Sequence, residues 1–378
     1  MRPVALILSF VLILVPLADA FETILQPRRV THRYRLARLF YRIDWNVWRW
    51  IAVKLPPGKK REAFLGVFGP LSLLMLFAIW VISLVLGFGF LHYGLHSEVH
   101  GPGQGLGGYI YLSGVAFFTL GFAELVPGAM TTRALGVIEA GLGFGFLAAI
   151  ISYLPVLYGA YSRRETAISL LDARAGSPPS AAELLLRLAR FGSLDHVEKF
   201  LEEWEVWSAE LLESHLSFPV LSYYRSQHDN QSWLATLTMI LDTCTLLMVL
   251  CKHNTYRAQL TYAMARHAAV DLSLVLGTRP RNLAVPVNRL TVQTRQQITA
   301  ALKEAGIDIR ETPDVDARLA ELRDAYEPFV RALGDEFLFA LPPFVPAEVS
   351  ADNWQRSSWM QKTPGIGKLT QGGPNEHF

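Results

Sequence analysis

The stretch Thr119-Leu120-Gly121-Phe122-Ala123-Glu124 lies between two long apolar segments of this 378-residue chain. The first segment runs from Ala63 to about Leu91 and the second from Ala134 to Tyr158. Each exceeds the roughly 20 residues that an α-helix needs to cross the hydrocarbon core of a bilayer. We therefore expect both segments to span a membrane and the quoted stretch to lie in the connection between them.

The connection begins with the glycine-rich residues 101–108 and continues with an apolar run from Tyr109 to Phe118. This run has about ten residues, which is too few to cross a bilayer as a helix. Non-helical backbone at membrane depth is tolerated only where it is buried in protein or lines a water-filled cavity. The pattern therefore predicts a re-entrant loop that enters and leaves the membrane on one side.

The quoted stretch resembles the Thr-Val-Gly-Tyr-Gly-Asp selectivity filter of potassium channels. The resemblance extends from Tyr109 to Tyr158 and is to the bacterial channels with two transmembrane helices and one pore loop. Such a filter replaces the hydration shell of K⁺ with rings of backbone carbonyl oxygens. The resemblance implies a homotetramer, because each chain supplies one loop, and K⁺ as the permeant ion. It assigns the filter to Thr119, Leu120, Gly121, Phe122 and Ala123, and the outer mouth to Glu124.

The sequence departs from the filter pattern at Ala123, which occupies the place of the second glycine. A Cβ atom there resists the positive φ that glycine adopts freely. Phe122 lacks the hydroxyl of the usual tyrosine, whereas Glu124 keeps a carboxylate at the outer mouth. A pore fold is therefore expected, and potassium selectivity is open.

The second apolar segment contains one acid, Glu139, and three glycines in alternation, Gly141, Gly143 and Gly145. Ionisable groups inside a span usually face the protein interior and pair there, so we expect Glu139 to support the filter from behind. The glycines allow either close helix packing or a gating bend. His92, His96 and His100 recur every four residues near the outer end of the first segment. They fit polar capping, or sensitivity to protons or zinc.

Charge predicts the orientation of these helices. Eleven Lys or Arg residues and one acid lie between Arg28 and Arg61, whereas residues 62–132 contain neither Lys nor Arg. Positive loops face the cytoplasm. We therefore expect an uncleaved helix from about Val4 to Leu25 that begins outside. The alternative is a cleavable signal peptide ending at Ala18-Asp19-Ala20. Trp45, Trp48 and Trp50 indicate either a segment on the inner membrane face or packed core.

The remainder of the chain has helical patterns, with predicted helices at 181–191, 194–215, 232–251, 256–276, 288–305 and 314–333. The third of these is apolar but contains Asp242, and we interpret it as a buried core helix. Cys244 and Cys251 are two turns apart on it, too far for a disulfide within one helix. The stretch from His215 to Trp233, which includes Pro219 and Tyr224, fits a packed turn or a ligand pocket.

These patterns predict an all-α protein of the inner cell membrane with four parts. They are an N-terminal membrane helix with a basic amphipathic segment (1–62), a pore domain (63–161), a helical cytoplasmic domain (162–341) and a disordered tail (342–378).

Two functions remain open: a cation channel, or a non-conducting membrane sensor or scaffold. The net charge of +2 argues against nucleic-acid binding. We find no catalytic triad, metal cluster or phosphate loop, so neither an enzyme nor a cofactor is expected, and no ligand of the cytoplasmic domain is indicated.

Overall fold

The computed structural model describes residues 2–26, 36–102, 105–122, 124–176, 178–190, 195–227, 231–252, 255–278, 280, 288–310 and 312–345. Most of these residues are helical. The chain divides into two compact units, Met1–Ala160 and Tyr161–Phe378. The predicted disordered tail therefore lies outside the described residues, apart from 342–345.

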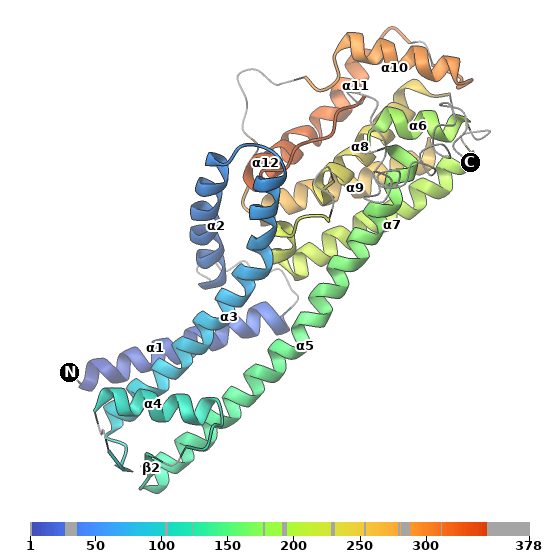
Figure 1. Cartoon of the computed structure of the whole chain (residues 1–378). Helices are drawn as coiled ribbons and strands as arrows, with labels where there is room; N and C mark the ends of the chain where they lie inside the picture. Colours follow the sequence, from blue (N-terminus) through green and yellow to red (C-terminus); the bar gives the residue numbers. More distant parts are fainter. Residues whose placement is uncertain are drawn as a thin grey trace, which may run out of the picture. The chain divides into compact units, whose positions relative to one another are not determined.

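Unit 1 contains four helices before the long helix α5 (Figure 1). They are α1 (Arg2–Ala20, followed by a π-helical turn, Phe21–Leu25), α2 (Leu36–Lys54), α3 (Lys59–Leu95) and α4 (Leu106–Phe117). Two short strands, β1 (Val99–His100) and β2 (Val126–Pro127), pair antiparallel on either side of α4. Helix α5 runs from Met130 to Ala175, so its residues from Tyr161 onward belong to unit 2.

Small residues let α1 pack antiparallel against α3. A Cβ atom at Gly94 would lie 2.7 Å from side-chain atoms of Leu6, and one at Gly87 would lie 2.7 Å from Ile13. Small residues at helix interfaces allow this close approach in membranes, where packing replaces the hydrophobic effect. At the end of α1, the carboxylate of Asp19 accepts hydrogen bonds from Trp80 Nε1 (2.9 Å) and the backbone N–H of Ala37 (3.0 Å). Asp19 therefore joins α1, α2 and α3.

The three tryptophans of α2 differ in burial, which bears on whether they form packed core or a surface segment. Trp45 is buried against Phe68, with 4.9 Å between ring centroids, and Trp48 stacks on Phe64 at 4.5 Å. Trp50 is 63% exposed and lies under the ammonium group of Lys54. Packing therefore explains Trp45 and Trp48, whereas Trp50 is on the surface.

Unit 2 packs helices around a central apolar helix, α8 (Trp233–Leu250). The other elements are α6 (Ala181–Arg190), α7 (Asp195–Ser217), the 3-10 helix η2 (Pro219–Tyr223), α9 (Tyr256–Val275), α10 (Val292–Glu304), α11 (Val315–Asp324) and α12 (Glu327–Phe337). Ser232 caps α8 by accepting a hydrogen bond from the backbone N–H of Ala235 (3.0 Å), as its residue type favours. Cys244 and Cys251 are free and buried, as predicted.

One predicted helix was wrong. We expected a single helix over 314–333, but α11 ends at Asp324 and α12 begins at Glu327. Pro328 at the second position of α12 disfavours helical backbone just before it and has no N–H to continue the hydrogen-bond ladder. Tyr326, with φ −133°, turns the chain there and is itself buried.

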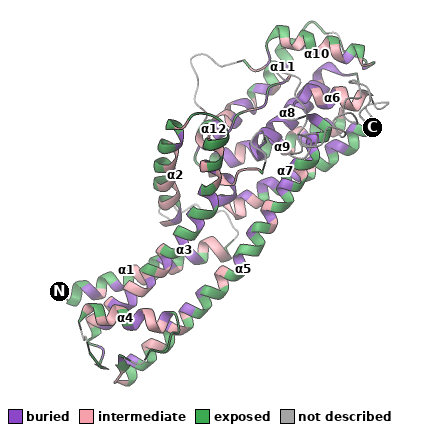
Figure 2. Cartoon of the chain, in the orientation of Figure 1, coloured by how far each residue is buried: buried purple, intermediate pink, exposed green. Residues whose placement is uncertain are grey.

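Among the described residues, four helices are long and apolar enough to cross a membrane: Arg2–Ile24, Lys59–Leu95, Met130–Ala175 and Trp233–Leu250. The most apolar 18-residue stretch of α8 is 94% buried within unit 2. The corresponding stretches of α1 and α5 are only 28% and 17% buried (Figure 2). Helix α8 is therefore the core helix that its sequence predicts. The apolar surfaces of α1 and α5 need a cover that one chain does not supply, which is compatible with a location in a membrane.

Candidate functional site

The residues after α4 form a tight loop with unusual backbone. Helix α4 ends with bonds from the N–H groups of Phe118, Thr119 and Leu120 to carbonyls within α4. Thr119 has φ 53° and Gly121 has φ 73°. Thr119 is one of three non-glycine residues with positive φ in the part of the chain that the structure describes. The left-handed region is unfavourable for a β-branched residue, so surrounding structure must hold Thr119 there.

Little of the loop is buried within one chain. The side chains of Phe118, Leu120 and Phe122 are 55%, 53% and 58% exposed. Of the predicted filter residues, the structure describes Thr119 to Phe122, and Ala123 lies outside the described residues. Three apolar side chains at alternate positions that face away from the chain's own core indicate a surface that a partner or lipid covers.

The β1–β2 ladder anchors the far end of the loop. Val99 pairs with Pro127, and His100 pairs with Val126. Gly101 has φ 136°, and a Cβ atom there would lie 2.0 Å from the carbonyl oxygen of Glu124, so only glycine fits this approach. Glu124 itself is exposed. The segment from Phe118 to Glu124 is thus tied to α4 at one end and to the ladder at the other.

Glu139 is the buried acid that the sequence singles out, and its side chain is fully inaccessible. Its Oε1 atom is hydrogen-bonded to the hydroxyl of Ser113 on α4, and that hydroxyl also lies 2.7 Å from the carbonyl oxygen of Val85 on α3. Its Oε2 atom lies 3.8 Å from Nε2 of the buried His92 on α3. Glu139 therefore braces α4 from behind and joins three helices at the level of the loop.

The partners of Glu139 are not apparent from the sequence. His92 Nδ1 is 2.7 Å from the hydroxyl of Ser97, and the hydroxyl of Tyr109 donates to the Ser97 carbonyl oxygen at 2.9 Å. A serine inside the apolar run and a histidine one residue after an apolar segment are the signals that could have pointed to them. The histidines spaced by four do not meet: His96 lies near Arg2, and His100 lies near Glu98. No group of metal ligands occurs among the described residues.

The three glycines of α5 differ in their surroundings. A Cβ atom at Gly143 would lie 2.0 Å from the carbonyl oxygen of Phe117 at the end of α4. Gly141 and Gly145 are exposed, and a Cβ atom at either would meet no atom within 4 Å. Gly143 is therefore a packing glycine that sets the contact between α4 and α5. Nothing within one chain requires glycine at Gly141 or Gly145.

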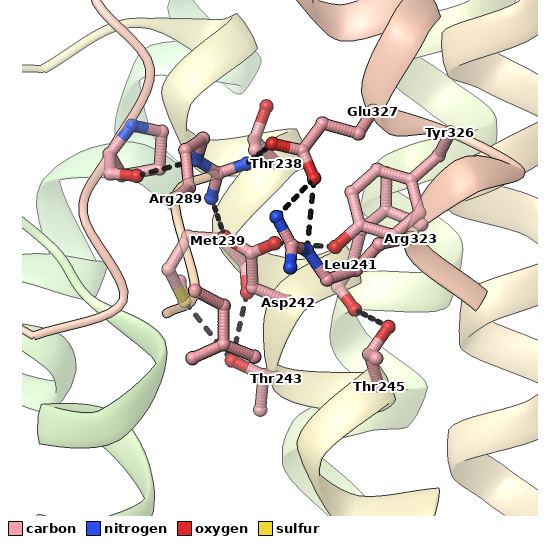
Figure 3. Close-up of polar contacts among 12 residues, drawn as sticks. Thr238, Met239, Leu241, Asp242, Thr243, Thr245, Arg289, Arg323, Tyr326 and Glu327 are labelled. Atoms are coloured by element: carbon pink, nitrogen blue, oxygen red, sulfur yellow. Dashed lines mark hydrogen bonds and ion pairs between the residues drawn. The ribbon is translucent and has the colours of Figure 1, made fainter. Parts of the chain in front are cut away.

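Unit 2 contains a second concentration of polar groups, around Asp242 of α8 (Figure 3). Asp242 accepts a hydrogen bond from Tyr326 (2.5 Å) and forms an ion pair with Arg289. Arg289 Nε also donates to the Pro342 carbonyl oxygen at 3.2 Å. Burial raises the pKa of Asp242 to about 6, although Arg289 acts in the opposite direction.

Glu327 extends this network to two more arginines. Its Oε2 atom lies 2.9 Å from Arg323 Nε, and its Oε1 atom lies 2.6 Å from Arg331 Nη2. Arg323 also donates to Asn288 Oδ1 at 3.0 Å. The network holds the segment at 288–290 and the chain near Pro342 against α8 and α12. Because its acids are buried and paired, the network stabilises the packing of these segments.

Arg164, also in unit 2, connects the last turns of α5 to η2 through hydrogen bonds. Its guanidinium is buried, lies 2.9 Å from Glu165 Oε1 and donates to the carbonyl oxygens of Leu221 and Tyr224, both at 3.0 Å. Burial lowers the pKa of His215, and the nearby positive charge of Arg164 lowers it further. The neutral imidazole therefore accepts a hydrogen bond from Arg164 at 3.2 Å. The chain around η2 is therefore a packed turn, which is one of the two alternatives that its sequence allows.

Known proteins give no further guide to this site. No family model, no curated protein and no solved structure matches the chain. The resemblance to potassium channels therefore rests on the residues of the α4 loop and on the helices that flank it.

Proposed function

We propose that this chain is the pore subunit of a homotetrameric cation channel of the inner cell membrane, with K⁺ as the permeant ion. The observation that carries the proposal is the α4 loop, where Thr119 and Gly121 have positive φ at alternate positions directly after a short apolar helix. Its oxygen ligands are backbone carbonyls and the Thr119 hydroxyl, which suit an alkali cation without its hydration shell.

The surroundings of the loop support the same function. Glu139 braces α4 through Ser113, and Gly143 lets α5 approach the end of α4, so the loop has a rigid support. Rows of exposed apolar side chains on α5, together with those of the loop, provide surface for three further copies or for lipid. The α5 residues concerned include Val137, Phe144, Leu147 and Ile151.

Ion flux tests the proposal and the role of the glycines. We expect Gly121→Ala to abolish flux, because a Cβ at φ 73° costs on the order of 1–2 kcal/mol in each of four chains. Wild type is expected to conduct with a weak preference for K⁺ over Na⁺, and Ala123→Gly to raise K⁺ flux. The measurement is K⁺ and Na⁺ flux into liposomes at equal protein density.

Gly136→Ala is the matched control, since it adds the same methyl group where the space is open and at a position with no assigned role. Strong potassium selectivity in wild type that Ala123→Gly leaves unchanged would show that the alanine fits the filter. Absence of flux in wild type and in every variant would overturn the channel and favour the second candidate, a non-conducting membrane sensor or scaffold. The buried network of unit 2 is compatible with either function.

The proposed topology places residues 28–62 and 163–378 in the cytoplasm, and residues 95–108 and 124–133 outside. A membrane-impermeant thiol reagent added from outside is expected to label Glu98→Cys, whose side chain is 61% exposed, but not Thr31→Cys. Cys244 and Cys251 are buried and give little background. Labelling of Thr31→Cys without Glu98→Cys would invert the topology and favour a cleaved signal peptide.

A further inference from the structure

Unit 2 contains an open cavity of about 530 Å³ between the end of α8, the start of α9 and α11. This volume is within the range of roughly 300–1,000 Å³ that small-molecule sites occupy. Its walls are formed by Met248, Val249, Thr255, Gln259, Tyr262, Arg310, Thr312, Asp314, Arg318 and Leu322. Neither the proposed pore nor the buried Asp242 network uses these side chains.

Two arginines, Arg310 and Arg318, line this cavity and carry its positive charge. The guanidinium of the exposed Arg310 makes no hydrogen bond or ion pair within the part of the chain that the structure describes. Arg318 forms an ion pair with Glu321 at 3.2 Å, in which the two side chains are 61% and 68% exposed. Exposed pairs of this kind are worth little, so Arg318 can exchange Glu321 for a better partner.

The remaining walls would fix the rest of a ligand. Asp314 begins α11 without a side-chain capping bond, so its carboxylate can accept from a ligand hydroxyl or amine. The hydroxyl of Tyr262 donates to the Leu322 carbonyl oxygen at 2.6 Å, which leaves its own oxygen able to accept. Met248, Val249 and Leu322 give an apolar wall. Most of the lining is polar, which suits a charged ligand with further polar groups.

We propose that this cavity binds a small organic anion, whose phosphate or carboxylate group is held by Arg310 and Arg318 and whose hydroxyl or amine donates to Asp314. Planar guanidinium groups suit both anions, because each offers paired N–H donors to two oxygens. The ring of Tyr262 lies 6.1 Å from that of Tyr326, which bonds Asp242, so a bound ligand would stabilise the contact of α9 with α12.

The test uses the full-length protein in detergent and two matched sets of compounds. The first is glucose 6-phosphate, glucuronate and uncharged glucose, and the second is AMP and uncharged adenosine, with inorganic phosphate at the same ionic strength as a further control. At least one organic anion is expected to raise the thermal unfolding midpoint in a saturable way that its uncharged parent does not reproduce. The first set also separates phosphate from carboxylate recognition.

Variants then locate the site. Arg310→Gln and Arg318→Gln are each expected to weaken binding at least tenfold by calorimetry. Lys303→Gln removes one positive charge from the exposed surface of α10 and is expected to leave binding unchanged. The proposal is overturned if no anion in either set stabilises wild type beyond its parent, or if Lys303→Gln weakens binding as much as Arg310→Gln. Both results are independent of ion flux.

Discussion

Replacing Gly143 with alanine is expected to destabilise unit 1 by about 1–3 kcal/mol or more and to abolish any ion flux. The added Cβ would lie 2.0 Å from the Phe117 carbonyl oxygen, which is backbone and cannot turn away as a flexible side chain could. Helix α5 or the end of α4 must therefore shift, and the shift displaces Thr119 and the loop. The thermal midpoint in detergent and the oligomer mass report the loss.

Gly141→Ala and Gly145→Ala are expected to change stability in the opposite direction. Both positions are open, and alanine is favoured over glycine in a helix by about 1 kcal/mol. If either control alters flux without lowering the midpoint, the gating bend is supported at that position. If the thermal midpoint of Gly143→Ala equals that of the two controls, Gly143 does not lie in close contact with the Phe117 carbonyl oxygen.

The second large effect concerns the buried ion pair of unit 2. Arg289→Ala is expected to destabilise unit 2 by about 3–5 kcal/mol at pH 7.5, because it leaves the Asp242 carboxylate buried without its cation. Denaturant unfolding followed by tryptophan fluorescence measures the change, since Trp233 on α8 is fully buried. The expected loss is smaller at pH 5, because burial raises the pKa of Asp242 to about 6 and the neutral acid needs no cation.

Two comparisons distinguish the loss of the Asp242–Arg289 ion pair from a general loss of stability. The double variant Asp242→Ala with Arg289→Ala is expected to cost less than the sum of the single variants, because each single change strands the other charge. Arg174→Ala breaks an exposed pair with Glu203, where both side chains are more than 40% exposed, and is expected to cost less than about 1 kcal/mol. Additive losses at Asp242 and Arg289 would contradict their direct coupling.

Hydrophobic periodicity predicted most helices of this chain because it is a local property. Helix α8 was predicted as core although its composition suits a membrane, since Asp242 and several threonines interrupt it. The split of 314–333 was missed because the weak signal of Pro328 was outweighed by the surrounding helical pattern. In unit 1, the alternation of glycines in α5 was evident from the sequence. Only the close approach of the Phe117 carbonyl oxygen distinguishes Gly143 from Gly141 and Gly145.

Long-range pairings were beyond prediction for the same reason. Nothing near Glu139 indicates that Ser113 and His92, which are 26 and 47 positions away, would be its neighbours. The Asp242 network likewise draws Arg289, Tyr326 and Glu327 from segments that no spacing rule connects. Sequence can indicate that a buried charge needs a partner, whereas the fold decides which residue supplies it.

Asp242 also matters during synthesis, before its partners Arg289 and Tyr326 have been made. As an apolar stretch of 18 residues, α8 has the length and composition of a membrane span, and in the proposed topology α1, α3 and α5 enter the bilayer before it. An aspartate at the centre of such a stretch opposes insertion by about 2.5–3.5 kcal/mol. Arg289 and Tyr326 are translated later. In the proposed topology, the residue that anchors the finished core of unit 2 therefore also opposes insertion of the nascent helix into the lipid.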